Sequence, residues 1–160
     1  MEKYIIMCVD DEREVLDSVA ADLEYFGEKF DFELCESAIE AGEIVEECLS
    51  EDRKIALILC DHVMPNKQGV DFLVELNESE ETAPIKKILL TGQAGLEATI
   101  QAVNDGGLNH YISKPWERSK MLEVVKKHLT DFIIENDENM SDYTDTLDSE
   151  RIFQAIYQNN

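Results

Sequence analysis

The sequence lacks the features that mark membrane-spanning, secreted and nucleic-acid-binding proteins. No apolar run approaches the roughly 20 residues that a helix needs to cross a bilayer, and the N-terminal residues form neither a basic leader nor a cleavage site. Basic residues are few, because 14 lysines and arginines face 36 acidic residues and the formal net charge is -22. Such a surface repels phosphate backbones and anionic lipids. We therefore expect a cytoplasmic protein that contacts neither nucleic acid nor membrane directly.

The sequence also lacks a cysteine pattern typical of metal sites. The sequence has no Cys-x-x-Cys pair, and no histidine lies at metal-ligand spacing from any of the four cysteines: Cys8, Cys35, Cys48 and Cys60. Cys8 and Cys60 lie inside apolar runs, where buried thiols usually act as small hydrophobic side chains. A zinc site and a redox role are therefore both disfavoured.

The most informative stretch covers residues 55–69. A short uncharged run ends at a single carboxylate, Asp61, and the chain then breaks at Pro65 and Gly69. A run of this length between turn residues is typical of a strand that is buried on both faces of a parallel sheet. Asp61 then lies at the carboxyl end of the strand, where open α/β sheets bind their ligands.

Strand-like and helix-like patterns alternate five times along the chain. The strand patterns cover residues 4–9, 30–35, 55–60, 85–90 and 110–113. The helical patterns cover residues 12–26, 37–49, 69–76, 96–103 and 117–134. Parallel strands joined by crossover helices produce such an order. The sequence therefore predicts an α/β fold, with a doubly wound, mostly parallel five-stranded sheet flanked by five helices.

Three local features add detail to this prediction. The alternation of apolar and acidic residues over 30–35 places that strand at an edge of the sheet. Gly27 should end the first helix, and Ser37 should cap the second. The large apolar residues of the second helix are expected to face inward: Ile39, Ile44, Val45 and Leu49.

Residues 131–160 differ in character from the rest, with eight acids and one arginine. The polar segment 135–145 is expected to be a flexible linker. A weak amphipathic pattern follows it, with Asp148 or Ser149 as the helix cap. Its apolar residues are Leu147, Ile152, Phe153, Ile156 and Tyr157. This helix either docks on its own domain or frays, or it binds a partner or forms a dimer. We therefore divide the chain into a domain over 1–130 and an acidic extension over 131–160.

Polar side chains follow four of the predicted strands and should converge on one edge of the sheet: Asp10, Asp11, Asp61, Thr91 and Lys114. Each has a simpler explanation alone, as a loop acid, a helix cap or a solvent-facing lysine. Together, three carboxylates repel one another unless a cation is present, and their hard oxygen ligands suit Mg²⁺ or Mn²⁺. Beside a metal and an ammonium, one carboxylate can attack a phosphoryl group while a hydroxyl binds one of its oxygens.

These local sequences resemble the receiver domain of two-component response regulators. The resemblance covers roughly residues 3–130 and implies the flavodoxin-like receiver fold. The matching pieces are Val9-Asp10-Asp11-Glu12, Leu59-Cys60-Asp61 with Met64-Pro65 and Gly69, Leu89-Leu90-Thr91-Gly92, Gly106-Gly107 and Tyr111-Ile112-Ser113-Lys114-Pro115-Trp116.

The resemblance implies a role for each matching residue. Asp61 would be the phosphoacceptor, which receives its phosphoryl group from a histidine kinase or a phosphotransfer protein. Asp11 and Asp61 would ligate Mg²⁺ through their side chains and Val63 through its backbone carbonyl, while Asp10 would act mainly through a metal-bound water. Lys114 would pair with the phosphoryl oxygens.

The resemblance also implies a switch. Thr91 would move to hydrogen-bond the phosphoryl group, and Tyr111 would turn inward as it moves. A half-buried aromatic residue on an edge strand is the simpler interpretation of Tyr111. The peptide bond between Lys114 and Pro115 would be cis.

We expect a phosphorylation-dependent signalling switch that acts through protein contacts, not an enzyme with an external substrate. A Mg²⁺-dependent phosphatase or phosphotransferase is the main alternative. Such enzymes commonly carry a second acid two residues after the nucleophile, where this chain has Val63. An idle receiver-like scaffold is a third interpretation, which the complete acid, threonine and lysine set disfavours. In the family, the positions of Val63 and Gln93 help to place or exclude the attacking water, and an apolar Val63 predicts slow self-dephosphorylation.

Overall fold

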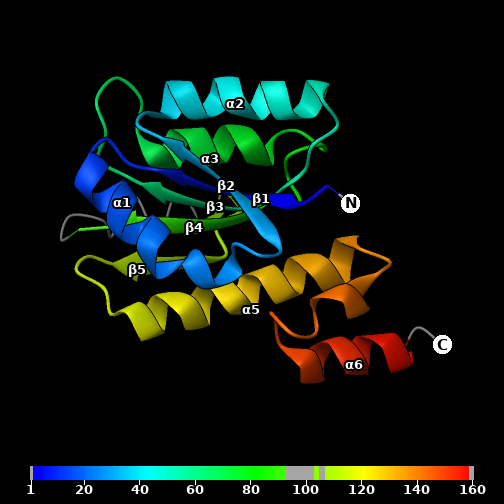
Figure 1. The fold of residues 1–160 in the computed structure, drawn as a ribbon. Helices are drawn as coiled ribbons and strands as arrows, with labels where there is room; N and C mark the ends of the chain where they lie inside the picture. The colour runs from blue at the N-terminus through cyan, green and yellow to red at the C-terminus, as the bar shows by residue number, and fades with distance from the viewer. Residues whose placement is uncertain (1, 93–102, 105–106, 159–160) are drawn as a thin grey trace.

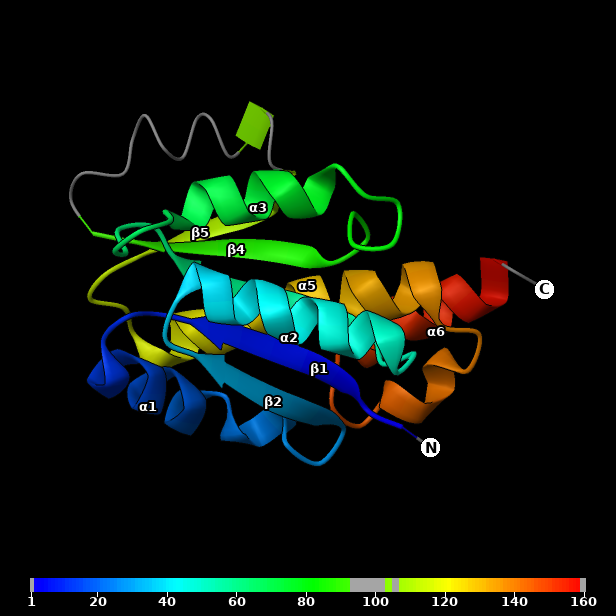
Figure 2. The same ribbon diagram turned by 90° about the horizontal axis from the view of Figure 1, so that it is seen from above.

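A parallel five-stranded sheet forms the centre of the computed structural model, which describes residues 2–92, 103–104 and 107–158 (Figures 1 and 2). The strands are β1 (Tyr4–Val9), β2 (Phe30–Cys35), β3 (Ile55–Asp61), β4 (Lys86–Thr91) and β5 (His110–Ser113). Their order in the sheet is β2-β1-β3-β4-β5, and every neighbouring pair is parallel. This order confirms the doubly wound topology and places β2 at an edge, as its sequence pattern predicts.

Helices cover both faces of the sheet, with α2 and α3 on one face and α1 and α5 on the other (Figure 1). The helices are α1 (Arg13–Asp22), α2 (Ala38–Ser50), α3 (Gly69–Asn77), α5 (Arg118–Asn136) and α6 (Ser149–Gln158). Two short 3₁₀ helices, η1 (Glu24–Phe26) and η2 (Met140–Tyr143), complete the list for the described residues. The helix predicted over 96–103 falls almost entirely outside those residues. None of the helices described combines the length and the apolarity that crossing a membrane requires.

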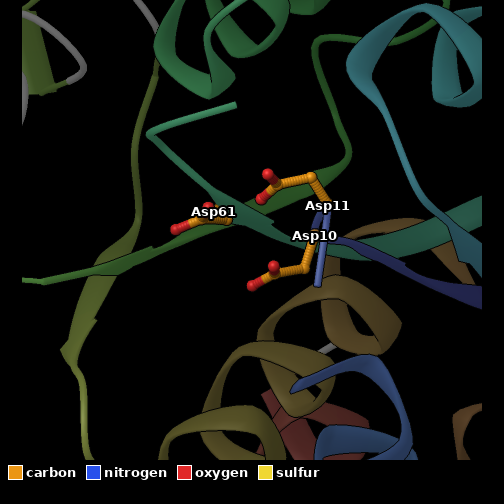
Figure 3. A group of neighbouring side chains, drawn as sticks. All are labelled: Asp10, Asp11 and Asp61. Carbon is orange, nitrogen blue, oxygen red and sulfur yellow. The ribbon is translucent and has the colours of Figure 1, made fainter. Parts of the chain in front are cut away.

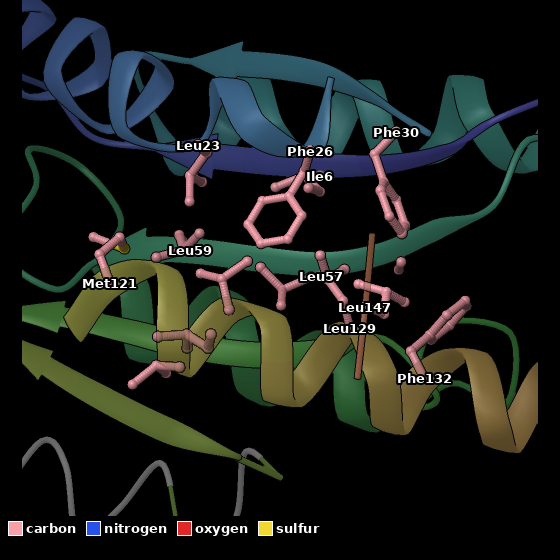
Figure 4. Packing of buried hydrophobic residues seen from close by; sticks show 14 of the residues in the cluster. Ile6, Leu23, Phe26, Phe30, Leu57, Leu59, Met121, Leu129, Phe132 and Leu147 are labelled. Atoms are coloured by element: carbon pink, nitrogen blue, oxygen red, sulfur yellow. The ribbon is translucent and has the colours of Figure 1, made fainter. Parts of the chain in front are cut away.

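The central strand β3 is buried along its whole length, as predicted for a strand covered on both faces. Its alternate side chains enter two apolar clusters. Leu57 and Leu59 face α1 and α5, whereas Ile58 and Cys60 face α2 and α3. Figure 4 shows the first of these clusters, in which β1 and β3 side chains meet those of η1 and α5. All four cysteines are buried and free, and for Cys8 and Cys60 this agrees with the role expected of them as small hydrophobic residues.

Two helix predictions need correction in detail. The first helix ends at Asp22, and a 3₁₀ turn separates it from Gly27. In α2, Ile39 is 53% exposed and Leu49 is 39% exposed, so the expectation that both face inward is wrong. The buried stripe is instead Ala38, Ala41, Val45 and Cys48, which recur at three- and four-residue spacing and so share one face of the helix. The predicted cap is confirmed, since Ser37 accepts a hydrogen bond from the backbone N–H of Glu40 (3.0 Å).

The segment expected to be a flexible linker is packed against the domain, so that expectation is wrong. Helix α5 continues to Asn136, and the chain then turns back to bury Met140, Tyr143 and Leu147 in the same cluster as β1 and α5. The Tyr143 ring lies 5.8 Å from that of Phe30. Three apolar residues at helical spacing therefore close this end of the core, although the surrounding composition is polar.

Helix α6 is fixed to α5 by contacts on one side. Asp148 caps it by accepting a hydrogen bond from the backbone N–H of Arg151 (3.2 Å), which confirms one of the two predicted caps. The backbone N–H of Asp148 in turn donates to Thr130 Oγ1 on α5 (3.2 Å). Arg151 forms an ion pair with Asp131, and Ile152 is fully buried. The extension is thus part of the packed structure.

This packing predicts the effect of shortening Ile152. Replacing Ile152 by alanine should lower the free energy of unfolding by about 3 kcal/mol, because it removes a buried side chain and leaves a cavity. The matched control Phe153→Ala, on the exposed side of the same helix, should change it by less than about 0.5 kcal/mol. Urea denaturation followed by circular dichroism measures both. Equal, small effects would mean that α6 unfolds separately from the domain.

Candidate functional site

Three carboxylates meet at the carboxyl ends of β1 and β3. Oxygens of Asp10, Asp11 and Asp61 all lie within 4.8 Å of one another (Figure 3). The sheet register explains this convergence, because Val9 pairs with Cys60 and the residues that follow them therefore lie side by side. Asp10 and Asp61 are buried, whereas Asp11 is exposed. The predicted acidic cluster is present, open to solvent on one side.

Lys114 brings a positive charge to this cluster from the β5 edge of the sheet. Its Nζ donates hydrogen bonds to Asp10 Oδ2 (2.9 Å) and Asp61 Oδ1 (3.0 Å). Lys114 directly follows the edge strand β5, and β4 lies between β5 and β3. The long lysine side chain therefore reaches past the end of β4 to the carboxylates. The peptide bond between Lys114 and Pro115 is cis, as the resemblance implied. The structure thus joins one ammonium to two of the three carboxylates.

The charges in the cluster are not balanced. Burial raises the pKa of the Asp61 carboxyl above its ordinary value, and the neighbouring carboxylates add to this, although the hydrogen bond from Lys114 acts in the opposite direction. Burial alone would lower the pKa of Lys114, but its hydrogen bonds to Asp10 and Asp61 outweigh burial and raise it. One ammonium cannot neutralise three carboxylates, so the cluster retains negative charge. An all-oxygen, partly open donor set of this charge fits a hard divalent cation.

Gly69 holds the loop that follows Asp61 against the end of β3. Its backbone N–H donates to the carbonyl oxygen of His62 (2.9 Å). A Cβ at this position would lie 1.9 Å from the carbonyl oxygen of Asp61 and 3.0 Å from Cys60 Sγ. Only glycine allows this approach, because the carbonyl group of Asp61 belongs to the backbone and cannot rotate away as a side chain could. Gly69 is also the first residue of α3, so the helix and the Asp61 carbonyl are in direct contact.

Thr91 and Tyr111 lie on one face of the sheet. Tyr111 on β5 pairs with Leu89 on β4, and Leu89 lies two residues before Thr91. Because alternate residues of a strand point to the same face, the side chains of Tyr111 and Thr91 lie on the same face of the sheet. Thr91 is buried, and its hydroxyl donates to the carbonyl oxygen of Gly92 (3.1 Å). The Tyr111 ring is 53% exposed on the edge strand. Gln93, the other position discussed for water access, lies outside the described residues.

One contact near the site has no signal in the sequence. Trp116 donates from its indole Nε1 to Asp22 Oδ2 at 2.7 Å, although the two residues are 94 positions apart. This bond ties the segment that carries Lys114 to the end of α1. Trp116 entered the prediction only as part of a matching motif, and Asp22 did not enter it. A long-range polar pair of this kind becomes visible only when the fold is known.

Comparison with known proteins gives a consistent result. The response regulator receiver domain family matches residues 6–126. The chain is 31% identical over 122 residues to the hydrogenase transcriptional regulatory protein HoxA of Cupriavidus necator, a match that covers 76% of this chain and 23% of that protein. It is 30% identical over 128 residues to the response regulator Rre1 of Synechocystis sp., covering 80% of this chain and 52% of Rre1. The chain thus spans about half or less of the length of these relatives.

A solved structure shows the same fold. The crystal structure of a CheY-like response regulator receiver domain protein from Methanospirillum hungatei superposes with a TM-score of 0.71 at 29% identity. The match covers 84% of this chain and 100% of that one. The architecture and the sequence motifs therefore point to the same family.

Proposed function

Because the chain belongs to the response regulator receiver domain family, we propose that Asp61 accepts a phosphoryl group and that this modification switches the protein between two states. Members of this family are the phosphoaccepting switches of two-component signalling and are not conventional enzymes. The observation that carries the assignment is the Lys114 ammonium, which lies 3.0 Å from Asp61 Oδ1 at the edge of the acidic cluster. A fixed cation at that place matches the charge of an incoming phosphoryl group.

The acidic cluster is the proposed site for Mg²⁺, with Mn²⁺ as an alternative. Asp10, Asp11 and Asp61 supply the carboxylates, and the backbone carbonyl of Val63 supplies a further oxygen. When bound, the divalent ion offsets the negative charge of the transferring phosphoryl oxygens. The exposed carboxylate of Asp11 leaves this side of the site open to exchange with solvent.

The residues of this chain divide the work of phosphoryl transfer. A carboxylate oxygen of Asp61 attacks phosphorus and forms an acyl phosphate, while the bond from phosphorus to the donor's imidazole nitrogen breaks. That nitrogen keeps the electron pair and takes a proton from solvent. Lys114 keeps its own proton and moves its hydrogen bond from Asp61 to a phosphoryl oxygen. The donor is a sensor histidine kinase or a phosphotransfer protein.

The switch follows from the new charge at Asp61. Phosphorylation replaces the single negative charge of the Asp61 carboxylate by the roughly two charges of a phosphoryl group, and it adds strong acceptor oxygens at the end of β3. The Thr91 hydroxyl leaves the Gly92 carbonyl and donates to a phosphoryl oxygen. Tyr111, which lies on the same face of the sheet, turns inward behind it and changes the surface around β5. This changed surface acts on an output protein through direct contact.

The metal-dependent part of the proposal can be tested with beryllofluoride, which imitates a phosphoryl group. Wild-type protein should bind beryllofluoride only when Mg²⁺ is present. Asp11→Asn should weaken Mg²⁺ binding at least about tenfold, because it removes one charged ligand. The control Asp17→Asn changes an acid that pairs with Arg13 on α1 and should leave binding unchanged. Isothermal titration calorimetry measures each affinity, and equal affinities for the two variants would remove Asp11 from the site.

A further inference from the structure

Helix α6 exposes two aromatic side chains that its packing does not require. Ile152, the Asp148 cap and the ion pair of Arg151 already fix the inner side of the helix. On the solvent-facing side of the helix, Phe153 is 51% exposed and Tyr157 is 82% exposed. The two residues are four positions apart, so they lie next to each other on the helix surface. We call this pair the aromatic face of α6.

The aromatic face belongs to an acidic segment of the chain. Residues 131–160 contain eight acidic residues and one basic residue, Arg151, whose guanidinium is paired with Asp131. Glu150 is exposed and lies three residues before Phe153 on the same side of the helix. Asp142 and Asp145 are exposed in and after η2, which packs against α6. The aromatic face is therefore an apolar pair in an acidic segment, with the exposed Glu150 one turn away.

We propose that the aromatic face of α6 is a docking surface for a partner protein that presents an apolar groove or helix face with a basic rim. Buried aromatic side chains commonly provide much of the energy of an interface, and the surrounding charges select the partner. A second copy of this chain is a poor occupant, because each copy carries a net charge of -22 and would bring acid against acid. Basic side chains around an apolar centre match both properties of the surface.

This surface is separate from the phosphoryl site. The family match ends at residue 126, so α6 lies outside it. The Asp61 cluster lies at the carboxyl ends of the strands, whereas α6 packs beside the C-terminal half of α5, near Thr130 and Asp131 (Figure 1). Docking on α6 therefore goes beyond the proposed phosphorylation and can be tested without it.

A synthetic helical peptide of about five turns, with leucine on one face and lysine on the other, imitates such a partner. Labelled with fluorescein, it should bind the unmodified full chain in an anisotropy titration, and affinity should fall as salt rises from about 0.05 to 0.3 M. The double variant Phe153→Ser/Tyr157→Ser should lose about tenfold or more in affinity. The matched control Tyr25→Ser/Ile39→Ser removes two side chains that are 51% and 53% exposed elsewhere, and should bind within about twofold of wild type.

Two measurements make the experiment decisive. A peptide with glutamate in place of lysine should not bind. Equal loss of affinity in both double variants, or equal binding of the two peptides, would overturn the proposal.

Sedimentation of the chain alone should show a monomer. A dimer that dissociates in Phe153→Ser/Tyr157→Ser would make a second copy the occupant and would also overturn it. Circular dichroism spectra of both variants should match that of the wild type.

Discussion

Replacing Gly69 by alanine should lower the free energy of unfolding by about 3 kcal/mol, a large effect for one added methyl group. The added Cβ would lie 1.9 Å from the carbonyl oxygen of Asp61 and 2.9 Å from its carbonyl carbon. Neither atom can rotate away, so either the loop or the end of β3 must shift. Because Asp61 is the last residue of β3, the shift also moves its side chain relative to Lys114. Urea denaturation measures the change in stability.

Gly42 offers a matched control for this substitution. It lies inside α2, and a Cβ there would meet nothing within 4 Å beyond the backbone of its own helix. Gly42→Ala should therefore stabilise the protein by about 0.5–1 kcal/mol, because alanine loses less conformational freedom in a helix. Opposite signs for the two variants are the expected result. If Gly69→Ala were as harmless as Gly42→Ala, the close contact between α3 and Asp61 would not exist in solution.

Replacing Asp61 by asparagine should abolish phosphorylation, which is the largest functional effect expected for any single substitution in this chain. The amide has nearly the same size and keeps a hydrogen-bond acceptor for Lys114, but it is not a nucleophile toward phosphorus. Incubation with acetyl phosphate and Mg²⁺, followed by intact-protein mass spectrometry, should show a phosphoryl adduct on wild type and none on Asp61→Asn.

The control for this loss is Asp17→Asn, which changes an exposed acid outside the cluster and should be phosphorylated like wild type. Circular dichroism should show the same fold for both variants. An adduct that persists on Asp61→Asn at the wild-type level would exclude Asp61 as the phosphoacceptor.

The sheet could be predicted from sequence because each strand carries its own signal. The apolar runs of β1 and β3 end at Asp10 and Asp61, and parallel strands bring such ends to one edge whatever the order of the strands.

The prediction for α2 was less accurate because it rested on large apolar side chains. The buried stripe instead includes the small residues Ala38 and Ala41, so size alone does not mark the inward face of this helix.

The extension was misjudged for a related reason. Its acidic composition favours a flexible linker. An average over the segment, however, hides the few apolar residues that are buried in the core. Within the extension, the Tyr143 ring packs against those of Tyr4 and Phe30 and helps to close this end of the core. Contacts between distant segments, such as Trp116 with Asp22, and the approach of Gly69 to Asp61 depend on the assembled fold and have no local pattern. The convergence of Asp10, Asp11, Asp61 and Lys114 could be predicted from the strand ends, but these supporting contacts could not.

The most direct test of the phosphoacceptor is to locate the phosphoryl group itself. Wild-type protein treated with acetyl phosphate and Mg²⁺ is digested, and the aspartyl phosphate is mapped by tandem mass spectrometry. We predict a single modified residue, Asp61, with Asp10 and Asp11 unmodified and no modification when Mg²⁺ is removed by a chelator. A phosphoryl group on any other residue, or none on a protein that still binds Mg²⁺, would contradict the proposed function.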